Sequence, residues 1–95
     1  MTDDALSAGS ARRLRVSVIS PSRVGFEGEA SAVVAPAHDG LLGILPGHAP
    51  MVVLLGSGSL SVRTAEGTRR FSVARGFLQV VDDAVSVLAE QVETT

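Results

Sequence analysis

GSLSVRTAEGTRRFSVARGFLQVVDDAVSVLA, residues 58–89, shows the plainest structural pattern in this chain. Leu60 and Val62 alternate with serines and an arginine, and this period of two is typical of a β-strand with one buried face. A second run, 69–73, follows Ala65-Glu66-Gly67, a loop of hairpin length in which glycine supplies a positive φ. We expect the two runs to pair antiparallel.

Asp82-Asp83 divides the rest of this stretch into two apolar runs, 77–81 and 84–89. Turns tolerate an acidic pair and strands disfavour it, so a second hairpin is predicted here. Its carboxylates are expected to point apart and to stay hydrated, which argues against a catalytic pair. The C-terminal half of the chain is therefore predicted to be an antiparallel meander.

The N-terminal half is less regular. Leu14 to Ile19 alternates like a strand, and Ser20-Pro21 ends it because proline lacks the N–H that a ladder requires. Met51 to Leu55 is continuously apolar, and its two valines favour a strand. The stretch before it, rich in small residues, glycine and proline, is predicted to be loop or short, bent strand. With no amphipathic helical stretch, these patterns predict an all-β fold, a sandwich or flattened barrel.

Length and composition limit the domain organisation. A chain of 95 residues fits one domain, which we expect over residues 13–93, after a disordered tail at 1–12. Cysteine is absent, so disulfides and thiolate metal sites are excluded, and the net charge of −2 disfavours nucleic acid as a main partner. The acidic N-terminus and the short apolar runs predict a cytoplasmic protein that reaches a membrane only through a partner.

His38, Asp39 and His48 are the residues that a metal or acid–base site would use. They lack the His-x-His or His-x-x-x-His spacing of such sites, and no third strong ligand lies nearby in the sequence. We therefore interpret them as ordinary loop or interface residues, and predict no metal, cofactor or catalytic residue.

Two other features have simple structural interpretations. Ser57 lies between Gly56 and Gly58, but no strand-to-helix transition follows, so a turn is favoured over a phosphate site or a nucleophile. The basic pairs Arg12-Arg13 and Arg69-Arg70 are typical of solvated strand edges that discourage aggregation.

The segment DGLLGILPGHAP, Asp39 to Pro50, carries more specific information. It resembles the G-x-L-G-I-(L/Y)-P-G-H-A-P signature of the ATP synthase epsilon subunit. RGFLQV, from Arg75 to Val80, and VSVLA, from Val85 to Ala89, follow in the same order, where that family reads S-G-G-F-L-E-V and V-T-V-L-A. The resemblance covers about residues 13–93.

This resemblance implies a ten-stranded β-sandwich that acts as a non-catalytic rotor subunit in the central stalk of an F-type ATP synthase. It implies contact with the gamma subunit and with polar loops of the c-ring, without a cofactor, at the cytoplasmic face of the cell inner membrane. The matching positions for gamma are Ser20, Pro50, Met51 and Val53. Those for the c-ring are Leu41, Leu42 and His48.

The chain departs from the family pattern at three places. Leu41 stands where members often carry an acidic residue. Arg75 replaces the first glycine of the usual pair, which suggests that no positive φ is needed there. The sequence ends at Thr95, where typical members continue into a regulatory helical pair. We therefore expect a natural short form or a trimmed piece that neither inhibits hydrolysis nor binds ATP.

Two alternatives of other classes remain at this point. A generic β-sandwich module for a carbohydrate or peptide could use the loop from Gly40 to Pro50, although only three phenylalanines are present to form an aromatic platform. A small enzyme could use His48, but no orienting partner or nucleophile stands in readable register.

Overall fold

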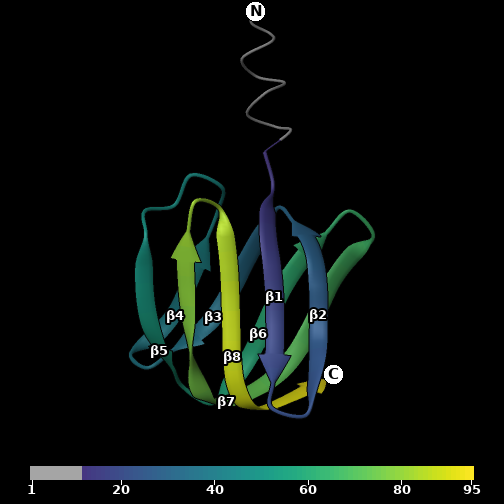
Figure 1. Ribbon diagram of the computed structural model, residues 1–95, viewed down its shortest axis with the longest axis vertical. Helices are drawn as coiled ribbons and strands as arrows, with labels where there is room; N and C mark the ends of the chain where they lie inside the picture. Colours follow the sequence, from purple (N-terminus) through teal and green to yellow (C-terminus); the bar gives the residue numbers. More distant parts are fainter. Residues whose placement is uncertain (1–11) are drawn as a thin grey trace, which may run out of the picture.

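A computed structural model describes residues 12–95, and this part of the chain forms eight β-strands and no helix (Figure 1). The strands are β1 (Leu14–Ser20), β2 (Arg23–Ala30), β3 (Ala32–Ala37), β4 (Gly40–Ile44), β5 (Met51–Leu55), β6 (Gly58–Thr64), β7 (Gly67–Val81) and β8 (Ala84–Thr94). The all-β prediction is confirmed. Within this part of the chain, nothing helical has the length and apolar character needed to cross a bilayer.

All eight strands belong to one hydrogen-bonded sheet, which runs β2-β1-β8-β7-β5-β3-β4, with β6 joining β3 to β7. The sheet folds over on itself into two layers (Figure 1). The front layer contains β2, β1 and β5 with the halves of β7 and β8 that flank their shared turn. The back layer contains β3, β4 and β6 with the first half of β7 and the second half of β8. Only the β1–β8 pairing is parallel in the described sheet.

The expected count of ten strands is wrong, because β7 and β8 pass through both layers without interruption. Over 67–73, β7 pairs with β6, and over 76–80 it pairs with β5. Arg75 lies at the bend between these halves with a φ of 58°. If β7 and β8 were each divided where they change layers, the number would reach ten. The two predicted runs 69–73 and 77–81 are thus one strand.

The bend also corrects the expectation for Arg75, which does have a positive φ. The next residue, Gly76, is restricted by space and not by its φ. A Cβ there would lie 2.5 Å from Ala89 Cα and would overlap the Leu88 carbonyl oxygen. Because β8 approaches so closely, only glycine fits at position 76. Position 75, where the backbone is left-handed, carries an arginine. The Arg75 guanidinium pairs with Glu90 on β8, 2.9 Å away.

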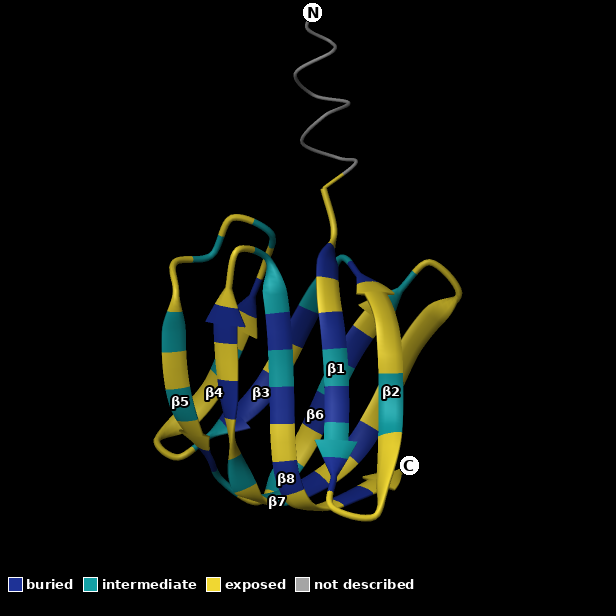
Figure 2. Ribbon diagram, in the orientation of Figure 1, coloured by how far each residue is buried: buried dark blue, intermediate teal, exposed yellow. Residues whose placement is uncertain are grey.

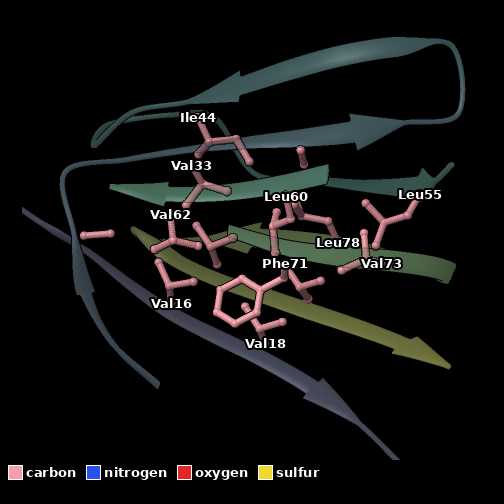
Figure 3. Close-up of a cluster of buried hydrophobic side chains, with 14 of the residues drawn as sticks. Val16, Val18, Val33, Ile44, Leu55, Leu60, Val62, Phe71, Val73 and Leu78 are labelled. Atoms are coloured by element: carbon pink, nitrogen blue, oxygen red, sulfur yellow. The ribbon is translucent and has the colours of Figure 1, made fainter. Parts of the chain in front are cut away.

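The core lies between the two layers and is built from aliphatic side chains around one phenylalanine (Figures 2 and 3). Phe71 is the largest fully buried side chain. Its neighbours come from both layers, and the alternation along each strand places them inside. The buried set is Leu14, Val16, Val18, Ala30, Val33, Ala35, Ile44, Leu55, Leu60, Val62, Val73, Leu78, Val80, Val85, Val87, Ala89 and Val92.

Both predicted hairpin turns are confirmed. Thr64 pairs with Gly67 across Ala65-Glu66, and Gly67 has a φ of 128°. Asp82 and Asp83, with φ values of 50° and 63°, join β7 to β8. Two successive left-handed residues make a turn whose twist matches that of a two-stranded ribbon.

β2 was not predicted as a strand. Its sequence, RVGFEGEA, mixes glycines and charged residues and shows no apolar alternation. It is extended because it pairs along the whole of β1, so tertiary pairing overrides weak local propensity. The predicted disordered tail lies outside the described residues except for Arg12, which forms an ion pair with Asp83.

Candidate functional site

Five apolar side chains form a band across the outer surface of the front layer. Strand register places Leu54 beside Phe77, Phe77 beside Leu88, Leu88 beside Ile19 and Ile19 beside Val24. Leu54 is 66% exposed, Val24 56%, and Phe77 and Leu88 39% each, while Ile19 is half-buried. We call these five residues the apolar row. Figure 2 shows exposed segments alternating with buried ones along the strands of the front layer.

The apolar row crosses five strands, and a strand spacing of about 4.8 Å makes it about 19 Å long. The next row on the same surface is more polar: Val52 is followed by Gln79, Ser86 and Ser17. A contiguous apolar strip with a polar border has the layout of a protein–protein interface.

The outer surface of the back layer is different. Alternation along β6 and the first half of β7 turns hydroxyl and guanidinium groups outward there. These residues are Ser59, Ser61, Arg63, Thr68, Arg70 and Ser72. Large apolar side chains are exposed on this layer as well, Val34 on β3 at 39% and Leu41 on β4 at 77%, but register does not pair them. Among the described residues, a continuous apolar row crosses the front layer only.

A second feature is the signature loop, Leu45–Pro50, which connects β4 to β5. The His48 N–H donates a hydrogen bond to the Leu45 carbonyl oxygen at 3.1 Å. Pro46 occupies the second position of this turn, and Gly47, with a φ of 89°, the third. Proline followed by a left-handed glycine is the pattern of a type II turn, so local chemistry alone explains the shape of the loop tip.

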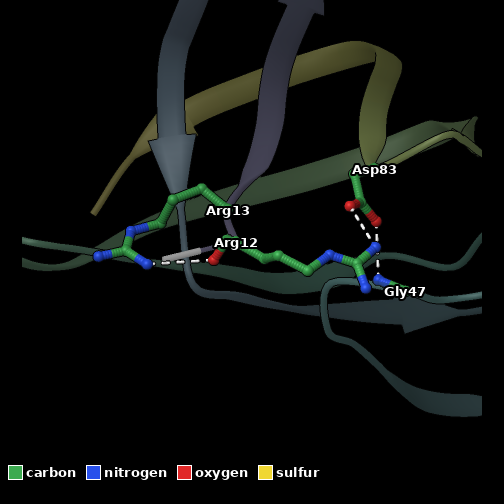
Figure 4. Close-up of polar contacts among 4 residues, drawn as sticks. All are labelled: Arg12, Arg13, Gly47 and Asp83. Carbon is green, nitrogen blue, oxygen red and sulfur yellow. Dashed lines mark hydrogen bonds and ion pairs between the residues drawn. The ribbon is translucent and has the colours of Figure 1, made fainter. Parts of the chain in front are cut away.

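Asp83 holds this loop against the β7–β8 turn (Figure 4). The Gly47 N–H donates to Asp83 Oδ1 at 2.7 Å, and the Arg12 guanidinium donates to Oδ2 at 2.7 Å. The hydrogen bond from Gly47 first, and the hydrogen bond from Arg12 second, lower the pKa of the Asp83 carboxyl below its ordinary value. Asp83 is half-buried, with its side chain 19% exposed, so protein groups replace part of the hydration expected for this carboxylate.

The residues predicted to contact gamma do not form one patch. Ser20, at the end of β1, is buried and its hydroxyl donates to the Arg23 carbonyl oxygen. Met51 packs against the core and Val53 is half-buried. Pro50 is exposed, but it precedes β5 at the end of the sheet opposite to Ser20.

Sequence reasoning missed the outward-facing residues of β5. In the run from Met51 to Leu55, Val52 and Leu54 are exposed. A continuous apolar run carries no signal of which alternate set faces out. Counting back by twos from the buried Leu55 gives the inward set, Val53 and Met51, and so leaves Val52 and Leu54 facing out, but only once the burial of Leu55 is known.

The residues predicted to contact the c-ring are also spread out. Leu41 and Leu42 begin β4 and have opposite burial, Leu41 exposed and Leu42 packed against the core. His48 lies beyond the other end of β4. His38-Asp39 forms the turn before β4, so it does not join His48. Among residues 12–95, no group of three or more His, Cys, Asp or Glu could hold a metal ion.

Two members of the predicted edge-protecting arginine pairs are exposed, as expected for solvated side chains, and also make contacts within the fold. Arg12 forms the ion pair with Asp83. The Arg69 guanidinium lies 5.5 Å from the ring centre of Phe26 and 5.6 Å from that of Phe71, within the range of a cation–π contact. Both arginines therefore link segments that are distant in sequence.

Comparison with known proteins adds independent information. Residues 13–95 match the family described as ATP synthase, Delta/Epsilon chain, beta-sandwich domain. The ATP synthase epsilon chain of Leptospira borgpetersenii serovar Hardjo-bovis (strain JB197) is 45% identical over 80 residues, which are 84% of this chain and 63% of that protein. The epsilon chain of Frankia casuarinae is 43% identical over 84 residues, which are 86% of this chain and 98% of that protein.

The chain thus spans less than two thirds of the length of the Leptospira relative and nearly all of the Frankia one. Among solved structures, a chain of the Euglena gracilis mitochondrial ATP synthase, OSCP/F1/c-ring, superposes with a TM-score of 0.80 at 20% identity. The match covers 86% of this chain and 53% of that one. A chain of the Tetrahymena thermophila central stalk/c-ring structure gives 0.67 at 16% identity, covering 85% and 66%. These two matches show a shared fold.

Proposed function

The chain belongs to the ATP synthase delta/epsilon chain family, with the family's β-sandwich domain over residues 13–95, and on this premise we propose that it is a non-catalytic rotor subunit of an F-type ATP synthase. In this role it links the gamma subunit to the c-ring and supports proton-driven ATP synthesis. It needs no cofactor. It reaches the cytoplasmic face of the cell inner membrane as a peripheral part of the complex.

The apolar row is the observation that carries this proposal. Leu54 and Val24 are each more than half exposed, so their apolar surface is in contact with water until a partner covers it. Each Å² of apolar surface that is covered contributes about 25 cal/mol to binding. A subunit that transmits torque needs a broad, rigid contact. Strands held in register on both sides meet that need better than a loop would.

We place the gamma contact on the front layer around the apolar row. Ser20 follows Ile19 directly, and Val53 lies between the exposed Val52 and Leu54, so two of the sequence-predicted positions border this surface. Pro50 and Met51 extend it towards the signature loop. The residues proposed for the c-ring, Leu41, Leu42 and His48, lie on β4 and on the signature loop.

The test compares aspartate substitutions on the two outer surfaces. Leu54→Asp and Leu88→Asp each put an unpaired charge into the proposed interface, so binding to purified gamma should weaken by about 2 kcal/mol, or about 30-fold. Ser61→Asp on the back layer is the matched control and should bind within about twofold of the parent chain. Binding can be measured by biolayer interferometry, with a thermal melt of each variant to verify folding.

Equal loss of binding for Leu88→Asp and Ser61→Asp would move the contact away from the front layer. No loss for either front-layer variant would contradict the proposed gamma contact.

A further inference from the structure

Asp83 occupies a position in the β7–β8 turn that glycine fits better. Asp82 and Asp83 both have left-handed backbone, with φ values of 50° and 63°. In a two-residue turn of this kind, aspartate and asparagine suit the first position and glycine the second. A residue with a Cβ at the second position costs stability, which points to a use for its side chain.

Every oxygen atom of Asp83 accepts a hydrogen bond from a different segment. Oδ1 accepts from the Gly47 N–H, and Oδ2 from the Arg12 guanidinium. The main-chain oxygen accepts from the Arg15 N–H at 2.8 Å. One residue therefore connects the signature loop, the segment before β1 and the first residues of β1 itself.

Arg12 closes the arrangement from the other side. A Cβ built on Gly47 would lie 3.3 Å from the nearer Arg12 nitrogen, so the guanidinium lies directly over the loop tip. The other described hydrogen bonds of the turn are local: His48 N–H to the Leu45 oxygen, and His48 Nδ1 with the Ala49 oxygen. These shape the turn but do not fix it to the sandwich.

We propose that Asp83 is the positioning residue of the signature loop, which its carboxylate fastens to the front layer so that Leu45 and His48 are presented to a partner in one orientation. The part concerning a partner rests on the proposed function, because that function assigns the loop a contact in the rotor. The fastening itself does not depend on it.

Charge supports the same assignment. The positive groups that act on Asp83 are Arg12, before β1, and Arg15, on β1. Together with the Gly47 N–H they favour the ionised carboxyl. Protonation would weaken the hydrogen bond to Gly47, so the loop should loosen only when the pH falls below the ordinary range of an aspartate.

The first test is made on the isolated chain by amide hydrogen exchange and NMR. Asp83→Gly relieves the left-handed backbone, so the hairpin should stay folded, yet the Gly47 amide should exchange about tenfold faster. It should also lose its low-pH chemical-shift titration. Asp82→Gly is the matched control, because it relieves the same turn at a residue whose side chain is exposed, and it should leave Gly47 unchanged. Asp83→Asn keeps an acceptor oxygen without the charge, so protection of the Gly47 amide should lie between that of the parent chain and that of Asp83→Gly, and the titration should be abolished.

If Asp83→Gly left the exchange and titration of Gly47 as in the parent chain, the fastening would be overturned whatever the chain's function. The second test uses the assembled rotor and a His48→Cys crosslink to a cysteine in a c-ring loop. Asp83→Gly should cut the crosslink yield severalfold, and Asp82→Gly should not.

Failure of the His48→Cys chain to crosslink at all would overturn the loop contact of the proposed function but not the fastening seen by NMR. A freed Gly47 amide with undiminished crosslinking would overturn the link between fastening and partner contact.

Discussion

The outer surfaces of the two layers share one core and yet differ, because exposed apolar side chains form a continuous row on the front layer and lie apart from one another on the back layer. Leu54, Phe77 and Leu88 line up across the front layer, whereas Ser61 and Arg70 stand opposite each other on the back layer. Both layers need the same inward alternation to bury Phe71 and its neighbours, so stability does not explain the difference outside. An exposed apolar row kept on one layer only indicates a surface reserved for a partner.

The two layers are joined at the bend of β7. Of the substitutions proposed here, Gly76→Ala at this bend should lower the free energy of unfolding most. The added methyl group would overlap the Leu88 carbonyl and crowd Ala89 Cα, both backbone atoms that cannot move independently. We expect a loss of more than about 3 kcal/mol in the free energy of unfolding, or no folding. Urea denaturation measures it.

Gly43→Ala is the control for that substitution. A Cβ at Gly43 would have no atom within 4 Å, and its stability should stay within about 0.5 kcal/mol of the parent chain. A Gly76→Ala chain as stable as Gly43→Ala would mean that β7 and β8 are farther apart than the structure has them.

Arg75→Gly, at the same bend, should stabilise the folded chain. Glycine adopts a φ near 58° without steric cost, and the gain should be about 0.5–1 kcal/mol after the greater chain entropy of glycine is subtracted. The lost ion pair with Glu90 joins two exposed side chains and contributes little. The measurement is again the unfolding free energy.

Arg75→Ala separates the two contributions, since it removes the ion pair and keeps the Cβ. It should be less stable than Arg75→Gly. The reverse order would show that the left-handed backbone at this position has no steric cost, while the difference between Arg75→Ala and the parent chain measures the Arg75–Glu90 pair.

Exchanging outer residues between the layers should change surface chemistry with little effect on stability. Leu54→Thr replaces the exposed leucine of the front layer by a β-branched polar residue, and Ser61→Val introduces a β-branched apolar residue on the back layer. Unfolding free energies should stay within about 0.5 kcal/mol. Binding of a hydrophobic dye such as ANS should fall for Leu54→Thr and rise for Ser61→Val. Equal dye binding by both would mean that the apolar row is not the exposed feature that distinguishes the layers.

The smallest effect on stability is expected from a change of pH that protonates Asp83. This residue lies at the end of the front layer opposite to the apolar row. The pKa of Asp83 is lowered from 3.8 in the folded chain, so as the pH falls the unfolded chain takes up this proton first. The stability contributed by the Asp83 hydrogen bonds is therefore complete above 3.8 and is lost as the pH falls through the lower folded value.

Thermal melts of the parent chain and of Asp83→Asn, from about pH 6 to about pH 2.5, measure this contribution. The gap between the two melting temperatures should narrow below the ordinary aspartate pKa, because protonated aspartate resembles asparagine. A gap that stayed constant over the whole range would contradict the role given to the ionised carboxylate.

Much of the fold follows from local pattern. The alternation of Leu60 with Val62 requires a strand, and glycine at 67 and the acidic pair at 82–83 require turns, because side-chain period and φ preference act within a few residues. The signature segment from Asp39 to Pro50 was sufficient to predict the family.

Other features depend on pairing between residues far apart in the chain. β2 is a strand because β1 pairs with it. Gly76 must be glycine because Ala89 passes beside it, and Asp83 is more than a turn residue because Gly47 and Arg12 come to it from elsewhere. The apolar row needs the register of five strands before any of its members become neighbours.

Sequence alone determined which residues alternate, where the chain turns and to which family it belongs. Which alternate set faces out, and which side chains share a surface, depended on the tertiary structure, since packing of one layer on the other sets both.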